Sequence, residues 1–469
     1  MSPSTPFPRA HRWLRLWLIA LNVGLLVAAV VLAITVTRRA LFLALLVPLA
    51  IAPFSYARLR LYDALEPVLA RWPRVLASVF GGGIALDFVL AAQLATGRAS
   101  EGLPMLHGPG VSWIGPVWFS AYALLFLGYA AAGIVRATHR LARALWSRIA
   151  PQGDATETTG SDAMDAPARA LASPERRAFL QHASLAGAAV PFFVSLSGVP
   201  LSYDLRVEER DVEVPGWPRE LDGLRVAHLS DIHVGGGMTR ERLQRMAELV
   251  NGARPDVVLH TGDFLTHRSG DFDTPLYEAL ATIRAPYGQW ACPGNHDYDD
   301  PARIARRLDH AGVTLLRDQL RTIEVAGRTI EIAGTNFVFS RTQHEEIFAR
   351  LFASLPARDG APRILLNHDP RNFFSLPDGA ADLVLSGHTH GGHVGVQLGT
   401  DHALTVVGLF GIPDQGVFAR RTAVGRPEPG PDMRLFVTRC VGFYGYPMRV
   451  GIPPEVALLR LRSPRTQRT

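Results

Sequence analysis

Residues 224–233 read LRVAHLSDIH, a short apolar run that ends in an aspartate and a histidine separated by one residue. The run 224–230 has the composition of a buried strand. The same pattern, an expected strand followed directly by polar residues, occurs four more times in the second half of the chain. The four later strands are expected at 256–260, 288–292, 363–366 and 382–385. Amphipathic helical stretches such as 240–251 and 301–310 separate them, and this alternation predicts an α/β layered fold.

The residues that follow these strands are the ones expected to carry chemistry. Ligand sites in such sheets lie beyond the carboxyl ends of the strands, so the five loops should converge on one place. Carboxylate, amide and imidazole ligands without a thiolate favour Mn, Fe or Zn. The seven candidate metal ligands are Asp231, His233, Asp263, Asn295, His368, His388 and His390. Seven ligands exceed what one ion needs, so we expect two divalent ions that share a bridging carboxylate, an arrangement suited to displacement at phosphorus.

The ordered motifs Asp-x-His, Gly-Asp, Gly-Asn-His-Asp, His and Gly-His-x-His resemble those of the calcineurin-like metallophosphoesterase superfamily, over residues 224–462. The resemblance implies a layered αββα β-sandwich and assigns the ligands to two ions. The first ion would be held by Asp231, His233, Asp263 and His390, and the second by Asp263, Asn295, His368 and His388. The resemblance also implies catalytic roles for Asn295, His296 and Asp297: His296 would assist the leaving group or bind the phosphoryl oxygens, and Asp297 would orient His296.

Other polar residues of these segments have plainer interpretations. His228 and His260 lie within expected strands, so we expect buried structural roles for both. Asp369 and His393 are either members of the site or simple polar groups of loops, and members of the resembled family often have Gln where His393 stands.

The C-terminal stretch 444–456, YGYPMRVGIPPEV, is similar to bacterial phosphodiesterases related to UDP-2,3-diacylglucosamine hydrolases. That similarity implies a lipid-linked phosphodiester or pyrophosphate as substrate. The Gly- and Pro-rich segment 399–431, with the apolar residues 406–410, is either a lip that faces the bilayer or a plain surface loop.

The first third of the chain contains four apolar runs, at 16–36, 40–56, 76–96 and 117–135. Each has about 17–21 residues, roughly what a helix needs to cross the hydrocarbon core of a bilayer. An all-α transmembrane bundle is therefore predicted for residues 1–150, with a soluble four-helix bundle as the alternative. Fourteen arginines fall in the loops on one side of these runs and three on the other, which predicts a cytoplasmic N-terminus. Asp87, inside the third run, is either a functional group or a polar contact between helices.

Residues 151–175 are rich in small and polar residues and are expected to form a flexible linker. In the segment 176–202, Arg176-Arg177-Ala178-Phe179-Leu180 precedes a modestly apolar stretch at 183–199 and resembles a twin-arginine export signal. That resemblance implies the twin-arginine translocation machinery as a partner. An ordinary fifth membrane helix predicts the same topology, whereas a stretch that lies in the interface would leave the second half in the cytoplasm.

The charge of the chain is divided unevenly between its halves. The net charge is +6, and it consists of +8 on residues 1–202 and −2 on residues 203–469. The net charge of −2 on the second half disfavours a nuclease, because binding to a phosphate backbone normally requires a basic surface. No nucleic-acid partner is therefore expected. With only two cysteines, a cysteine-rich zinc module is excluded.

Together these patterns predict a multi-pass protein of the bacterial inner membrane whose catalytic domain, residues 203–469, is on the periplasmic face. The predicted activity is hydrolysis of a lipid-linked or envelope phosphodiester by metal-activated water. One alternative is a UDP-2,3-diacylglucosamine-type hydrolase of lipid A synthesis on the cytoplasmic face. Another is a membrane sensor or transporter with a metal-binding domain, for which Asp87 is the support.

Overall fold

The computed structural model describes residues 114–149 and 174–464, with short gaps, and five single residues nearer the N-terminus. The gaps are at 236, 267–272, 299, 338–340, 355–359, 400–401, 421–432 and 445–447. The chain divides into two compact units, Met1–Leu196 and Ser197–Thr469. The first three apolar runs lie almost wholly outside the described residues, as do Asp87 and the linker up to residue 173.

The first unit contains the fourth apolar run, which is helical. It lies in α5 (Ile114–Ile149), and within α5 the segment Ser120–Trp146 is long and apolar enough to cross a membrane by length and composition. The second long helix, α7 (Pro174–Ser202), begins at the twin-arginine-like segment and ends in the second unit. Its apolar part, Ala189–Ser202, is about 21 Å long, shorter than the ~30 Å of a bilayer core.

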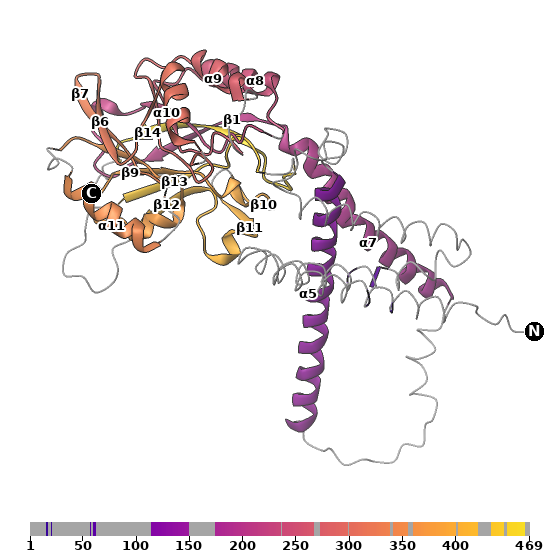
Figure 1. Ribbon diagram of the computed structural model, residues 1–469. Helices are drawn as coiled ribbons and strands as arrows, with labels where there is room; N and C mark the ends of the chain where they lie inside the picture. The colour runs from indigo at the N-terminus through magenta and orange to yellow at the C-terminus, as the bar shows by residue number, and fades with distance from the viewer. Residues whose placement is uncertain are drawn as a thin grey trace, which may run out of the picture. The chain divides into compact units, whose positions relative to one another are not determined.

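The second unit is built on two six-stranded sheets (Figure 1). The first sheet has the order β1-β14-β2-β3-β4-β5, in which β2 to β5 run parallel and β14 is antiparallel to β2. Its strands are β1 (Arg206–Glu213), β2 (Arg225–Leu229), β3 (Val257–His260), β4 (Gln289–Ala291), β5 (Val313–Leu315) and β14 (Glu455–Arg462). The helices between these strands are α8 (Arg240–Ala253), α9 (Thr274–Ala281) and α10 (Pro301–His310).

The second sheet has the order β12-β13-β9-β8-β7-β6, parallel in its centre and antiparallel at both edges. Its strands are β6 (Gln319–Val325), β7 (Arg328–Gly334), β8 (Arg363–Leu366), β9 (Leu383–Ser386), β12 (Gly416–Arg420) and β13 (Met433–Val437). The helix α11 (Arg341–Ser354) joins β7 to β8, and a small hairpin, β10 (Gly395–Gln397) and β11 (Ala403–Thr405), follows β9. Short 3-10 helices are η2 (Arg219–Leu221), η4 (Pro370–Ser375), η5 (His390–Gly392) and η6 (Gly408–Phe410).

Three apolar clusters define the layers. The central cluster combines residues of both sheets, among them Val226 and Leu259 of the first and Ile364 and Leu385 of the second. A second cluster packs α8, α9 and α10 against the first sheet, and a third packs α11 and η4 against the second sheet. The order of layers is therefore helix, sheet, sheet, helix, and the α/β domain predicted from the strand pattern is confirmed.

The predicted strands and helices of this unit lie within one or two residues of the observed ones, and α10 has the predicted bounds. The turn at Ala326-Gly327 joins β6 and β7 in a hairpin, with Val325 paired to Arg328. Several strands were not predicted, among them β1, RVEERDVE. It lies at the edge of its sheet, where charged side chains are tolerated because one side faces solvent, so it lacks an apolar signal.

Candidate metal centre

The seven candidate ligands follow the carboxyl ends of five strands, β2, β3, β4, β8 and β9. Five of them have a left-handed backbone, with φ of 53° at Asp231, 52° at His233, 54° at Asp263, 69° at His388 and 52° at His390. Such conformations cost energy in residues other than glycine and persist only where the surrounding structure enforces them, typically at functional sites. Backbone strain is therefore present at five of the seven positions that the strand-end pattern selects.

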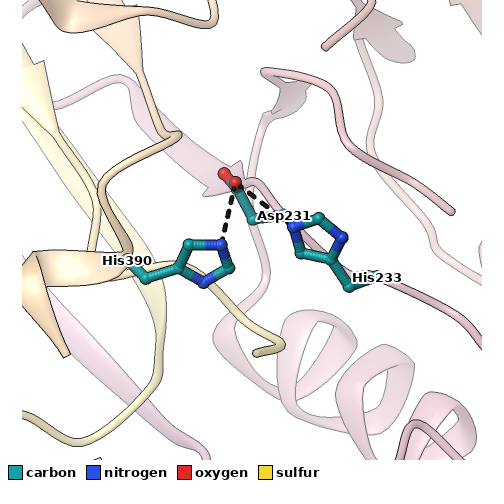
Figure 2. A group of neighbouring side chains, drawn as sticks. All are labelled: Asp231, His233 and His390. Atoms are coloured by element: carbon teal, nitrogen blue, oxygen red, sulfur yellow. Dashed lines mark ion pairs between the residues drawn. The ribbon is translucent and has the colours of Figure 1, made fainter. Parts of the chain in front are cut away.

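One group consists of Asp231, His233 and His390, whose ligand atoms lie within 4.8 Å of one another (Figure 2). The Oδ1 atom of Asp231 lies 3.3 Å from Nε2 of His390 and 3.7 Å from Nε2 of His233. Figure 2 shows both imidazole rings directed at this carboxylate. The three side chains thus present one oxygen and two nitrogens to a common point.

The second oxygen of Asp231 is occupied by protein donors. Oδ2 accepts hydrogen bonds from the Ser230 hydroxyl, from the His388 backbone N–H at 2.9 Å and from Cys440 Sγ at 3.1 Å. Gly387 is required here, because a Cβ at this position would collide with the Ser230 hydroxyl and with Oδ2 itself. These contacts fix the carboxylate so that Oδ1 is the oxygen available to a cation.

A second group consists of Asp263, His368 and His388, with Asn295 beside them. Nε2 of His368 lies 3.1 Å from both Oδ1 of Asn295 and Nδ1 of His388. Nδ1 of His368 donates to the Thr261 carbonyl, which leaves Nε2 as the ligand atom.

Asp263 belongs to both groups through a single atom. Its Oδ2 lies 3.3 Å from Nε2 of His368 and 3.5 Å from Nε2 of His233, while Oδ1 accepts the His296 backbone N–H at 2.8 Å. One oxygen is therefore held by the backbone, and the other faces the ligands of both groups. This is the geometry that a bridging carboxylate requires.

The donor set fits divalent cations. Oδ1 of Asp231 and both ring nitrogens of His233 are buried and make no hydrogen bond within the part of the chain that the structure describes. Unpaired buried polar atoms are costly unless something else satisfies them. Burial raises the pKa of Asp231, but the neighbouring His390 and His368 outweigh burial and hold that pKa well below its usual value. The carboxylate therefore stays charged and can bind a cation.

The structure gives Asp297 a role that differs from the predicted one. Its buried carboxylate accepts three backbone N–H groups, from Asp263 at 2.8 Å, Phe264 at 3.0 Å and Gly294 at 2.8 Å. The prediction that Asp297 orients His296 is wrong. The carboxylate instead shapes the turn that presents Asp263.

His296 is oriented by a backbone carbonyl instead. Its Nδ1 lies 2.9 Å from the carbonyl oxygen of Thr266, which leaves Nε2 as the free nitrogen of the ring. The ring of Tyr444, half exposed, lies 4.7 Å from the His296 ring and 5.3 Å from that of His233. Neither Tyr444 nor Cys440 follows one of the five strands directly, so the strand pattern gives no signal for either residue.

The buried structural roles expected of His228 and His260 are confirmed. His228 and His260 are buried, and their Nε2 atoms pair with Thr261 and Gln289. Burial lowers the pKa of His228 to about 3 and that of His260 to about 4, so both are neutral. The Asp369 side chain accepts the Arg371 backbone N–H at 3.0 Å, at the start of η4.

Comparison with known proteins shows which proteins this part of the chain resembles. Residues 224–392 match the family model described as calcineurin-like phosphoesterase. An uncharacterized metallophosphoesterase of Aquifex aeolicus is 29% identical over 269 residues, which cover 56% of this chain and 94% of that protein. Phosphodiesterase YaeI of Escherichia coli is 28% identical over 247 residues, covering 50% of this chain and 82% of that protein. A zebrafish (Danio rerio) transmembrane protein with metallophosphoesterase domain is 30% identical over 268 residues, covering 54% of this chain and 57% of that protein.

The match over residues 224–392 lies in the unit that carries the clustered ligands. Together with the donor set, these matches identify the chain as a metal-dependent phosphoester hydrolase, whose residues 224–392 are similar to the calcineurin-like phosphoesterases.

Proposed function

We propose that this metal-dependent phosphoester hydrolase is a membrane-anchored phosphodiesterase that uses two divalent ions, Mn, Fe or Zn, on a lipid-linked or envelope phosphodiester. The observation that carries the two-ion proposal is the position of Asp263 Oδ2, within 3.5 Å of a ligand nitrogen from each group. When bound, such a pair of ions would acidify a water and polarise the phosphoryl oxygens.

The chain's own residues prepare the site for an in-line reaction. The contacts to Oδ2 of Asp231 and to Nδ1 of His368 fix which atoms face the substrate side of the centre. The Thr266 carbonyl holds Nδ1 of His296, so Nε2 is the atom that would deliver a proton to the departing oxygen or bind a phosphoryl oxygen. Asn295 adds a neutral oxygen beside His368, where another carboxylate would add repulsive charge.

The two-ion proposal is tested by metal titration of the full-length chain in detergent after treatment with a chelator. Hydrolysis of bis(p-nitrophenyl) phosphate should be lost and should return as Mn²⁺ is added, reaching its plateau at two equivalents per chain. A plateau at one equivalent would contradict the second ion and leave the hydrolase itself intact.

An exposed apolar face beside the centre supports a lipid-linked substrate. The hairpin β10–β11 follows His388 and His390, and Val396 pairs with Leu404 across it. Because side chains alternate along strands, Val396, Leu398, Leu404 and Val406 lie on one face of the hairpin. All four are exposed, as are Leu409 and Phe410 in η6, with exposed fractions from 44% at Val406 to 79% at Phe410. We call these six residues the apolar face.

The opposite side of the hairpin is polar and packed against the domain. Gln397 bonds Gln415, and Thr405 is buried against Asp414. The hairpin thus turns its apolar side outward, the reverse of the usual pattern for a half-buried hairpin in water. Acyl chains or the bilayer surface would bury these side chains favourably.

The lipid proposal is tested with a variant in which Val396, Leu398, Leu404 and Val406 are all serine. Turnover of a phospholipid diester in vesicles, relative to that of the soluble diester, should fall about tenfold or more, because a loss of ~1.4 kcal/mol of apolar burial is already tenfold. The matched control is Arg321→Ser on the exposed strand β6, which should leave the ratio unchanged. An unchanged ratio in the four-serine variant would remove the support for a lipid substrate.

For location, the proposal is a multi-pass inner-membrane protein with its catalytic unit on the periplasmic face, delivered by the segment that begins at Arg176-Arg177. The candidate span Ser120–Trp146 supports a membrane protein, and the arginine bias supports the orientation. Topology reporters fused after Thr469, with and without deletion of the two arginines, test it. A periplasmic signal that is lost on deletion is expected; a cytoplasmic signal would favour hydrolysis of a cytoplasmic lipid precursor instead.

A further inference from the structure

Arg449 is a fully buried arginine next to the metal centre. Its side chain is the largest of the completely buried ones in the described part of the chain. In that part no carboxylate lies within ion-pair distance of it, unlike the buried Arg210 and Arg439, which both pair with Glu455. Burial lowers the pKa of Arg449 to about 10, so it remains charged at neutral pH. A buried charge without a counter-ion is expensive and calls for a specific compensation.

The compensation consists of three backbone carbonyl groups. Nη1 donates to the carbonyl oxygens of His390 at 3.1 Å and Arg439 at 2.7 Å, and Nη2 donates to that of Gly442 at 2.5 Å. His390 is a candidate ligand of the first ion. Arg439 and Gly442 flank Cys440, whose Sγ bonds Oδ2 of Asp231. One guanidinium therefore joins the loop after β9 to the loop after β13.

The backbones of both loops are strained, so each loop needs a contact that holds it in place. His390 has a φ of 52° and Cys440 a φ of 66°, each in the left-handed region. The second loop is also held tightly to the ligand segment: the Gly442 N–H donates to the Asp231 carbonyl at 3.0 Å, and a Cβ at Gly442 would collide with the Ile232 carbonyl. A shift of either loop would move Asp231 Oδ1 relative to His390 Nε2.

We infer that Arg449 is a positioning residue for the metal centre, which sets the distance between Asp231 and His390 through the backbone of the two loops. Its guanidinium bonds to backbone carbonyls and not to the ligand side chains. Three donors in one plane serve three carbonyls, and lysine cannot reproduce this arrangement because its ammonium group is a single point on a flexible stem.

The same residue connects the centre to the end of α7. The Arg449 N–H donates to the Gly198 carbonyl at 2.9 Å, and a Cβ at Gly198 would lie 2.9 Å from the Arg449 carbonyl. Arg242 donates to the Ser202 carbonyl at 3.2 Å and lies over the Tyr203 ring. The last turn of α7 thus belongs to the second unit and supports Arg449.

The test compares Arg449→Lys and Arg449→Met in the full-length chain in detergent. Affinity for Mn²⁺, measured by competition with a fluorescent chelator, should fall about tenfold or more, the usual cost of losing a group that orients ligands. The visible spectrum of the Co²⁺-loaded protein should also change, since it reports ligand geometry. The matched controls are Arg363→Lys and Arg363→Met. Arg363 is also buried, pairs with Glu331 at 2.7 Å and lies at the end of β8 remote from His368.

The control variants should lower the unfolding temperature and leave both metal readouts unchanged. If the Arg449 variants lower the unfolding temperature equally but keep wild-type Mn²⁺ affinity and Co²⁺ spectrum, the residue is structural and the inference fails. Should neither Arg449 variant fold, hydrogen exchange of the wild-type chain decides: Mn²⁺ should slow exchange in 439–443 and 448–450 as well as at the ligands. Protection confined to the ligand loops would overturn the inference.

Discussion

Replacing Asp263 by asparagine removes one negative charge from the centre of the site with little change in shape. The amide oxygen of asparagine can still accept the His296 N–H that Oδ1 now accepts at 2.8 Å, so the turn should be preserved. The other atom changes from a carboxylate oxygen to an NH₂ group. It would then face Nε2 of His233 at 3.5 Å and Nε2 of His368 at 3.3 Å as a donor. Both metal positions therefore lose the same ligand.

The magnitude follows from this shared position. Losing a group that only supports a ligand costs about 10–100-fold in metal affinity, so losing a shared ligand should cost at least about 100-fold, or ~2.7 kcal/mol. Turnover of bis(p-nitrophenyl) phosphate at fixed Mn²⁺ should fall by at least about 10²–10³-fold, as for other preorganised electrostatic contacts. Metal content by mass spectrometry and initial rates are the two measurements.

The matched control is Asp273→Asn, the same substitution at the buried carboxylate that precedes α9 and pairs with Arg303 and Arg307 at 3.2 Å each. It should lower the unfolding temperature and leave metal content and turnover near wild type. The reasoning is refuted if Asp263→Asn retains two ions and wild-type turnover.

Three further predictions concern other parts of the unit. His296→Gln should lower kcat about 10²–10⁴-fold with metal content unchanged, and the loss should be greater for an alkyl than for a p-nitrophenyl leaving group if Nε2 serves the departing oxygen. Gly387→Ala should cost about 1–3 kcal/mol in urea unfolding and reduce Mn²⁺ affinity, because the new methyl displaces Oδ2 of Asp231; wild-type affinity would show that the carboxylate is not held there. Burial raises the pKa of Glu455, but Arg210 and Arg439 outweigh it and hold that pKa below its usual value. Its stabilisation is therefore complete above the unfolded pKa of about 4.3 and is lost as pH falls below it. Glu455→Gln should be less stable at pH 7, with a shallower loss of stability on acidification, and an unchanged acid slope in urea unfolding would contradict this.

The pattern of strands followed by polar residues was sufficient to predict the α/β layers and the candidate ligands. This pattern is informative because a run of apolar residues indicates a buried strand, and the carboxyl ends of parallel strands meet at one edge of a sheet. The pattern did not predict the edge strand β1, because its exposed side carries charged residues in place of apolar ones. The prediction for Asp297 failed for a related reason: adjacency to His296 in sequence says nothing about the direction of its carboxylate, which turns toward the backbone of Asp263 and Gly294.

The sequence by itself determined which side chains are available as ligands and in which unit they lie, because residue type and strand periodicity are local properties. Only the tertiary structure decided that Oδ2 of Asp263 is the atom shared by two groups, that Thr266 orients His296, and that Arg449 joins the loop of His390 to the loop after β13. Each of these depends on the direction of backbone N–H and carbonyl groups from segments far apart in the chain. Every residue but proline carries both of those groups, so their pairing leaves no trace in the order of side chains.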